Sequence, residues 1–399
     1  MNLPPLLPFD EAQARLLAMA NPLGAESVPV GETAGRYLAE PLVAQRTRPW
    51  CDLSAMDGYA MRGDDLDGPW RVVGESRAGA PYDAALAKGQ TARISTGAAM
   101  PEGADAVLLQ EDAVRNGDHL ARASDERPAS RWIRRKGFEF VERDVLLRAG
   151  TRIGAAQLAL AIAAGHAQLR VGKQPKLALI ESGDELALPG EGAGDRLPAS
   201  NGAMLRAMAE PFAACHLVPP VPDRRDALRD ALEAAMDCDV IATSGGASVG
   251  DHDLIRPVLE AWGADLAFWR IAMKPGKPLL VARKGRTLVL GLPGNPVSAF
   301  VTGYLFLLPL LRALAGACDP QPTITALPLA TALPPGGNRT EFVRGRMTSE
   351  GVAPIDVRDS SALCALASAD ALIHRDIDAP AAPAGSMITA YPLGNGGSA

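Results

Sequence analysis

The sequence has few aromatic residues, few cysteines and no excess of positive charge. Phe, Trp and Tyr make up 5% of its 399 residues, and the formal net charge is −6. This balance argues against a general nucleic-acid-binding surface, so any anion site must be a local basic pocket. The five cysteines include no Cys-x-x-Cys pair, so neither a disulfide framework nor a structural zinc site is indicated. A reducing cytoplasm fits this cysteine usage.

Targeting and membrane signals are also lacking. Residues 1–10 have no basic region and no long apolar core, so we expect no signal peptide. Residues 287–311 contain no charged residue and are long enough to span a bilayer, but prolines at 293, 296 and 309 interrupt them. We therefore predict a strand, a loop and a buried helix there, and no membrane partner.

The first half of the chain shows two kinds of pattern. Residues 1–48 and 143–174 hold helical patterns at 10–20 and 155–164, which we expect to pack together as a helical platform and dimerisation domain. Residues 49–142 are rich in Gly, Pro and short β-prone runs. They predict a β-rich module inserted into the platform.

The second half alternates strands and helices before turning all-β. Residues 175–317 show the alternation typical of a doubly wound, mostly parallel sheet covered on both faces. Residues 318–399 have short strands and Pro-rich turns, which predict a small all-β domain. The predicted fold class is a multi-domain α/β protein.

The stretch 239–253 organises the α/β part. An apolar strand at 240–243 ends at polar and glycine residues whose backbone N–H groups can approach a bound anion. Open α/β sheets bind ligands at the carboxyl ends of their strands. A plain strand-to-helix turn, capped by Asp251 or Asp253, is the alternative interpretation.

Three further loops belong to the same predicted cleft. A loop with Glu185 follows the strand at 176–180, and its carboxylates suit Mg²⁺ held together with phosphates. Lys274 and Lys277 flank a Pro-Gly turn and suit an oxyanion. The loop 291–298 leads into a helix whose N-terminus favours an anion. No Walker A or G-x-G-x-x-G motif occurs.

The β module offers its own candidates. Asp57 lies beside Gly58, and Thr96 follows a short strand; both also fit ordinary turns. A basic run at 134–136 precedes Glu139, and such runs are usually solvated faces.

These motifs resemble the MoeA/gephyrin family of molybdopterin molybdotransferases. Ser-Ala-Met-Asp-Gly-Tyr-Ala, Ser-Gly-Asp-Glu-Leu, Ser-Gly-Gly-x-Ser-Val-Gly-Asp, Met-Lys-Pro-Gly-Lys-Pro and Gly-Leu-Pro-Gly-Asn-Pro-Val-Ser occur in the family's order across nearly the whole chain. The resemblance implies a MogA-like α/β domain and an elongated homodimer. It also implies a reaction in which adenylylated molybdopterin and molybdate give molybdenum cofactor and AMP, with Mg²⁺.

The resemblance also assigns roles to residues of this chain. Residues matching positions tied to activity are Asp57, Thr96, Glu185 and Asp253. Those expected to bind the pterin substrate are Ser182, Gly183, Asp184, Asn201, Ser244, Gly245, Gly246, Ser248, Gly250, Asp251, Pro293, Gly294 and Asn295. Those expected to bind molybdate are Lys274, Lys277, Ser298, Arg344 and Ser361, with Ser360 beside them. Expected Mg²⁺ ligands are Asp57, Glu185, Asp251 and Glu139.

Three departures separate this chain from the usual family pattern. Phe138-Glu139 stands for Glu-Asp, Ala199 stands for an aspartate, and Glu181-Ser182 stands for Ser-Thr. The lost aspartate leaves two alternatives to the enzyme: a gephyrin-like scaffold or a weakly active paralogue. An enzyme acting on a different pterin is a third reading. A MogA-type adenylyltransferase and molybdoenzyme apoproteins are the partners that the resemblance suggests.

Overall fold

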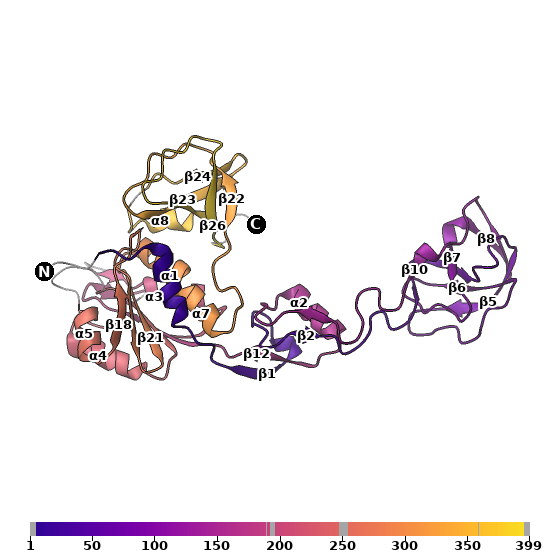
Figure 1. Ribbon diagram of the computed structural model, residues 1–399, viewed down its shortest axis with the longest axis horizontal. Helices are drawn as coiled ribbons and strands as arrows, with labels where there is room; N and C mark the ends of the chain where they lie inside the picture. The colour runs from indigo at the N-terminus through magenta and orange to yellow at the C-terminus, as the bar shows by residue number, and fades with distance from the viewer. Residues whose placement is uncertain (1–4, 189, 192–195, 247–253, 358, 395–399) are drawn as a thin grey trace.

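The computed structural model describes residues 5–188, 190–191, 196–246, 254–357 and 359–394. The chain is elongated. The α/β domain and the C-terminal domain lie at one end, the inserted β module lies at the other, and the platform lies between them (Figure 1).

A six-stranded sheet forms the centre of the α/β domain. Its strand order is β16-β13-β17-β21-β20-β18; the first four strands are parallel to one another, and β20 runs antiparallel to both of its neighbours, β21 and β18. The strands are β13 (Lys176–Glu181), β16 (Ala214–Leu217), β17 (Val240–Ser244), β18 (Asp265–Trp269), β20 (Leu280–Lys284) and β21 (Thr287–Leu292). A small parallel pair, β14 (Leu186–Ala187) and β15 (Leu197–Pro198), follows β13.

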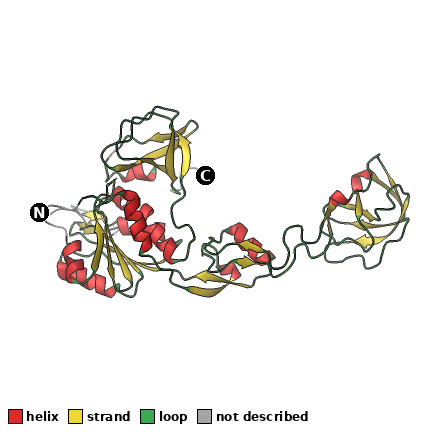
Figure 2. Cartoon of the chain, viewed as in Figure 1, coloured by secondary structure: helices red, strands yellow, loops and turns green. Residues whose placement is uncertain are grey.

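Helices cover both faces of this sheet, which confirms the doubly wound prediction. Alternate residues of the buried strands point into two separate apolar cores: Leu177 and Leu179 into one, Ala178 and Ile180 into the other. The helices are α3 (Asn201–Ala209), α4 (Arg225–Ala234), α5 (Ile255–Ala261), α6 (Pro296–Thr302) and α7 (Leu308–Leu314), with a π-helical turn, η4 (Gly303–Leu307), between the last two. Figure 2 shows these layers at the left.

The apolar stretch 296–314 is one continuous helix in the core, and 83% of its most apolar window is buried inside the fold. Pro309 has no N–H, so the carbonyl of Leu305 lacks the donor that an ordinary helix would supply. The side chain of Gln13 fills this place, because its Nε2 donates a 2.7 Å hydrogen bond to the Leu305 oxygen. A buried carbonyl is thereby satisfied from a distant part of the chain.

The N-terminal helix does not pack where the sequence suggested. Helix α1 (Phe9–Ala18) belongs to the α/β core: the Phe9 ring lies 5.7 Å from that of Phe306 and 4.9 Å from that of Phe342. The expected pairing of two platform helices is therefore wrong. The buried face of α1 carries the aromatic ring of Phe9 and the side chain of Leu16. Both are large apolar groups that pack into the deep core between the helix and the C-terminal domain.

The platform contains one α-helix packed on short strands. Helix α2 (Ala155–Ala163) faces the antiparallel pair of β1 and β12, where Leu169 and Val171 are buried. The elements are β1 (Ala25–Pro29), the 3-10 turn η1 (Val30–Glu32), β2 (Leu42–Val43), β11 (Val145–Leu147) and β12 (Gln168–Gly172). β2 pairs with β11, so segments from both sides of the insertion build one unit.

Two chain segments form the neck that carries the β module (Figure 1). Arg48 N–H donates to the Phe140 carbonyl at 2.9 Å, and its guanidinium pairs with Glu139 at 2.7 Å. Both side chains of that ion pair are about half exposed, so it adds little to stability.

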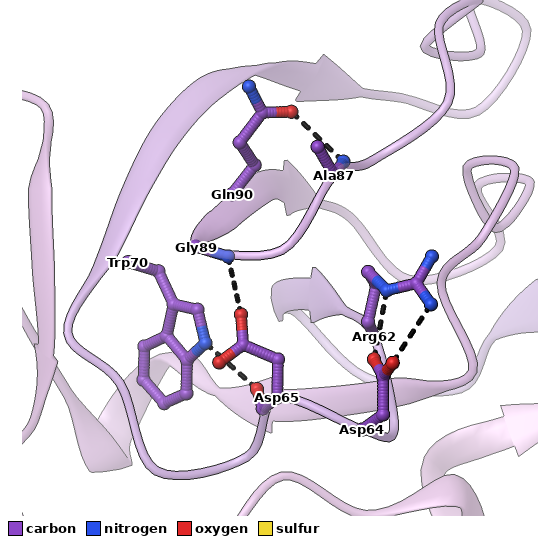
Figure 3. Close-up of polar contacts among 7 residues, drawn as sticks. All are labelled: Arg62, Asp64, Asp65, Trp70, Ala87, Gly89 and Gln90. Carbon is purple, nitrogen blue, oxygen red and sulfur yellow. Dashed lines mark hydrogen bonds and ion pairs between the residues drawn. The ribbon is translucent and has the colours of Figure 1, made fainter.

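The β module is a six-stranded sheet of order β7-β4-β6-β5-β9-β8, with β3 and β10 paired beside it. Its elements are β3 (Leu53–Ser54), β4 (Gly58–Met61), β5 (Trp70–Ser76), β6 (Gln90–Ile94), β7 (Ala106–Leu109), η2 (Gln110–Asp112), β8 (Ala113–Asn116), β9 (His119–Arg122), η3 (Ser130–Trp132) and β10 (Ile133–Arg134). Asp65 joins two of its loops (Figure 3): its carbonyl accepts from the Trp70 indole at 2.9 Å and its carboxylate from Gly89 N–H at 2.6 Å.

The C-terminal domain is a β-sheet that includes a strand of the α/β domain. β19 (Met273–Lys274) pairs in parallel with β23, so the lysine loop is built into the C-terminal sheet. The other elements are β22 (Thr325–Pro328), β23 (Thr340–Thr348), β24 (Gly351–Pro354), α8 (Leu363–Ala367), β25 (Ala371–Arg375) and β26 (Met387–Pro392).

Candidate functional site

Three loops meet at the carboxyl edge of the α/β sheet. They follow β13, β17 and β21, which are adjacent parallel strands. A Cβ atom at Gly245 would lie 2.3 Å from the Ser182 carbonyl oxygen, and one at Gly294 would lie 3.4 Å from the Gly245 Cα. Gly245 also has φ of +100° and Gly246 has φ of +63°, a region that L side chains rarely adopt. The close approach to Ser182 therefore requires glycine at position 245.

The side chain of Asn201 joins two of these loops. Its Nδ2 donates to the Ser244 hydroxyl at 3.0 Å and to the Gly294 carbonyl at 2.7 Å. The Ser244 hydroxyl donates in turn to the Pro293 carbonyl at 3.1 Å. The buried Oδ1 of Asn201 has no protein partner among the described residues. At the point where the loops converge, this oxygen can therefore accept a hydrogen bond from a ligand or from a water molecule.

A buried carboxylate holds the start of α3. Glu181 is 5% exposed and accepts hydrogen bonds from the backbone N–H groups of Asn201 at 3.2 Å and Gly202 at 2.6 Å. Burial raises the pKa of Glu181, while these two bonds act in the opposite direction. A Cβ at Gly202 would lie 2.6 Å from the Glu181 carboxylate, so the long acidic side chain and this glycine fit as a pair.

The loop after β13 presents carboxylates at its exposed rim. The Ser182 hydroxyl donates to Asp223 at 2.9 Å, and Asp184 accepts from the backbone of Asp223 at 3.1 Å. The Glu185 carboxylate folds over Gly183, where a Cβ would lie 2.7 Å from its oxygen. Glu185 is exposed and so remains accessible to a cation or a ligand.

The two predicted lysines differ in their surroundings. Lys274 pairs with Glu341 of β23 at 3.1 Å, and its own side chain is 46% exposed. Lys277 is half-buried and forms no ion pair within the described ranges. Of the two, Lys277 is the cation whose charge no carboxylate among the described residues balances.

A loop of the C-terminal domain lies over the N-terminus of α6. Asn295 Nδ2 donates to the Ser360 hydroxyl at 2.8 Å, and Val297 N–H donates to the Ser360 carbonyl at 3.0 Å. Ser361 donates to Asp359 through both its N–H and its hydroxyl, at 2.7 Å each. Ser298, in the first turn of α6, is 6% exposed. The C-terminal domain thus closes one side of the site.

Arg344 holds that loop through its backbone. It is buried, and its guanidinium donates to the carbonyls of Ala362 at 3.2 Å, Asp359 at 3.0 Å and Val357. Burial lowers the pKa of Arg344. The arrangement makes Arg344 a support of the loop; contact between Arg344 and molybdate stays a prediction.

Four predicted residues, Ser248, Gly250, Asp251 and Asp253, lie outside the described residues. The described parts of the chain contain no group of three or more His, Cys, Asp or Glu side chains placed to hold a metal ion.

Asp57 and Thr96 do come together, but at the other end of the molecule. The Asp57 carboxylate accepts from the Thr96 N–H at 2.6 Å and from its hydroxyl at 3.0 Å, and these bonds lower the pKa of the exposed Asp57. The β module that carries them lies far from the α/β sheet (Figure 1). Glu139 lies in the neck with Arg48 and is not grouped with Glu185.

Sequence reasoning missed three residues that shape the site. Glu181 was noted only as a departure, yet it organises α3. Asp223 was expected only to cap the helix that follows it, and Glu341 was not considered. Glu181 follows the apolar run 177–180 of β13, and a charged residue at that place is a signal for a cap on a neighbouring helix. Asp223 and Glu341 carry no comparable signal because their partners are distant in sequence.

The fold and the site define a multi-domain α/β protein whose glycine-containing loops converge at the carboxyl edge of a parallel sheet. Comparison with known proteins agrees along the chain. Residues 7–165 match "MoeA N-terminal region (domain I and II)", residues 178–313 match "Probable molybdopterin binding domain", and residues 326–393 match "MoeA C-terminal region (domain IV)".

Similar proteins share most of its length. Two relatives carry the name molybdopterin molybdenumtransferase. The one from Haemophilus influenzae is 35% identical over 318 residues, 78% of either chain, and the one from Staphylococcus aureus is 31% identical over 383 residues, 92% of this chain and 91% of the other. The molybdopterin biosynthesis MoeA protein of Pyrococcus horikoshii has a TM-score of 0.82 and 26% identity, and the match covers 98% of this chain and all of that one. The chain belongs to the MoeA family of molybdopterin molybdenumtransferases.

Proposed function

We propose that this chain inserts molybdate into adenylylated molybdopterin, giving molybdenum cofactor and AMP in the cytoplasm. The observation that carries the proposal is the convergence of three strand-end loops at Ser182, Gly245 and Gly294. Lys277, on the loop after β19, adds a lysine that forms no ion pair with the described residues. Exposed N–H groups and helix N-termini suit the phosphates of an adenylylated pterin, and the lysine suits a tetrahedral oxyanion. Ser298 and the 359–361 loop complete the molybdate side.

Mg²⁺ fits this cleft only in part. Glu185 is an exposed carboxylate at its rim, and Mg²⁺ is commonly held by one or two carboxylates together with substrate phosphates. When bound, the ion would neutralise charge on the phosphates. Glu185 would hold it, and Asp57 of a second subunit would add a second carboxylate.

A second subunit is needed because of where Asp57 lies. The platform separates the β module from the α/β domain of the same chain (Figure 1). In a closed twofold dimer each cleft is equivalent and each can borrow the module of the other chain. We therefore propose a homodimer. A MogA-type adenylyltransferase would supply the substrate and molybdoenzyme apoproteins would receive the product.

The direct test is conversion in vitro. Purified protein is mixed with adenylylated molybdopterin, molybdate and Mg²⁺, and AMP and molybdenum cofactor are measured. We expect AMP release that depends on molybdate and is lost when Mg²⁺ is chelated. Folded protein that binds the adenylylated pterin but releases no AMP above background would instead favour the scaffold alternative. The absence of the family's usual aspartate at position 199, which is alanine here, also favours that alternative.

A further inference from the structure

A cavity of about 590 Å³ lies where three parts of the molecule meet, away from the three strand-end loops. The platform contributes Tyr37 and residues 148–152. The α/β domain contributes Phe212, Tyr304 and Arg312, and the segment 318–323 leads on to the C-terminal domain. Its volume is in the range of pockets that hold small molecules.

The cavity gathers positive charge without matching negative charge. Arg148, Arg152 and Arg312 all line it, and none of them forms an ion pair within the described residues. Asp319 is the one acidic side chain in the described lining. Arg312 is half-buried, and burial lowers its pKa. Asp319 attracts the Arg312 guanidinium, which also donates to the Pro320 carbonyl at 3.3 Å, but one carboxylate does not balance three arginines. An anion in the cavity would therefore be stabilising.

Phe212 holds two of these guanidinium groups close together. The Arg312 guanidinium lies 4.6 Å from the centre of its ring and that of Arg152 lies 5.2 Å from it. Contact with the ring face favours each cation, but two like charges against one ring repel each other. An oxyanion accepting hydrogen bonds from both would remove this repulsion.

Tyr37 adds a neutral donor to the two cations. It is 6% exposed, it lines the cavity, and burial raises its pKa, so its hydroxyl keeps its proton at neutral pH. The hydroxyl of Tyr304 is already used, because it donates to the Pro392 carbonyl at 2.8 Å. Two guanidinium groups and one phenol are the donors that recognise a phosphate-like group.

We propose that this cavity binds a small, multiply charged oxyanion of the phosphate class. Neither the name of any relative nor the cleft at the sheet edge accounts for it. A ligand there would touch the platform, helix α7 and the 318–323 segment together, and would hold the platform and the α/β domain in one relative orientation.

Cys318 gives a local readout of occupancy. Its thiol lines the cavity and is exposed, while Cys364, on α8, is exposed outside the cavity and serves as an internal control. Full-length protein is alkylated with iodoacetamide at rising concentrations of inorganic phosphate or of molybdate, with KCl at equal ionic strength as reference. Peptide mass spectrometry follows both cysteines. We expect phosphate to slow labelling of Cys318 about fivefold or more and to leave Cys364 unchanged, because a bound anion blocks access and disfavours the thiolate.

Variants locate the anion. Arg152→Gln should weaken protection about tenfold, since it removes a charge-assisted contact. Arg312→Gln should act likewise, while Arg229→Gln, an exposed arginine of α4, should have no effect. Lys277→Ala should leave protection intact, which separates this site from molybdate in the proposed active cleft. Equal labelling with phosphate and with KCl would overturn the proposal. So would protection that follows protein concentration instead of phosphate, which would show a second copy of the chain seated on the cavity.

Discussion

Replacing Glu181 tests how the cleft is held together. In the folded protein its carboxylate accepts two N–H groups at the first turn of α3, at 3.2 and 2.6 Å, where Asn201 then reaches the other loops. In Glu181→Ala both N–H groups lose their acceptor and a small void remains. Removing a helix cap costs about 0.5–2 kcal/mol and leaving a buried donor unpaired costs about 1–3 kcal/mol, so we expect a loss of about 2–4 kcal/mol in local stability.

Peptide-level hydrogen exchange measures the free energy of local opening at the start of α3. The measurement is therefore not affected by other domains that unfold separately. A loss of about 2–4 kcal/mol should speed exchange at the start of α3 by about 30- to 1000-fold, while exchange in α4 stays unchanged. Glu181→Gln is the matched control. It keeps the size and one acceptor oxygen, but turns an NH₂ group toward the second N–H, so its effect should lie between wild type and alanine.

The pH dependence gives a second signature. Burial raises the pKa of Glu181 in the folded state above its unfolded value. Its contribution to stability is therefore complete below the ordinary pKa of glutamate and is lost as the pH rises through the folded pKa. Glu181→Gln cannot titrate, so the stability advantage of wild type over this variant should shrink as the pH rises. An advantage that grows with pH, or unchanged exchange in Glu181→Ala, would refute the reasoning.

Four further predictions concern the cleft and the core. Lys277→Ala should weaken molybdate use at least about tenfold without loss of helicity, because a charge-assisted contact is removed; unchanged molybdate dependence of AMP release would contradict the assignment. Mixed dimers of Asp57→Ala and Lys277→Ala chains should regain about a quarter of wild-type activity if chains pair at random. Recovery no better than the summed homodimers would show that Asp57 does not act across subunits. Gln13→Leu should lower the free energy of unfolding by about 1–3 kcal/mol, since the Leu305 carbonyl is left buried without a donor; equal urea midpoints would argue otherwise. Ala199→Asp should reduce the Mg²⁺ concentration needed for AMP release, because it adds an oxygen ligand, and an unaltered Mg²⁺ dependence would place this residue away from the metal.

The parallel sheet and its strand-end loops could be predicted because their signals are local. An apolar strand such as 240–244 followed by two glycines specifies both a buried strand and the tight turn that ends it. Because the strands are parallel, the turns at their carboxyl ends all lie at one edge of the sheet. Asp57 and Thr96 could be singled out for the same reason, since each lies in a turn directly beside a strand.

Contacts between distant segments could not be predicted in this way. The apolar stripe of α1 specifies a helix but not its partner, and only the aromatic rings of Phe306 and Phe342 show that the α/β core receives it. Arg344 matched a family position for molybdate, yet three carbonyls of one loop now account for its hydrogen bonds. Periodicity describes which face of an element is apolar, and says nothing of what covers that face.

The bond between Gln13 and Leu305 also bears on synthesis of the chain. Its partners are separated by 292 residues, so α1 is synthesised well before the segment that it packs against. At translation rates of about 5–20 residues per second, the helix waits for about 15–60 s before its partner leaves the ribosome. During that interval the ring of Phe9 has no core to enter. Growing chains are therefore expected to offer an apolar N-terminal helix to chaperones, and one that stops before residue 305 cannot bury it as the finished protein does.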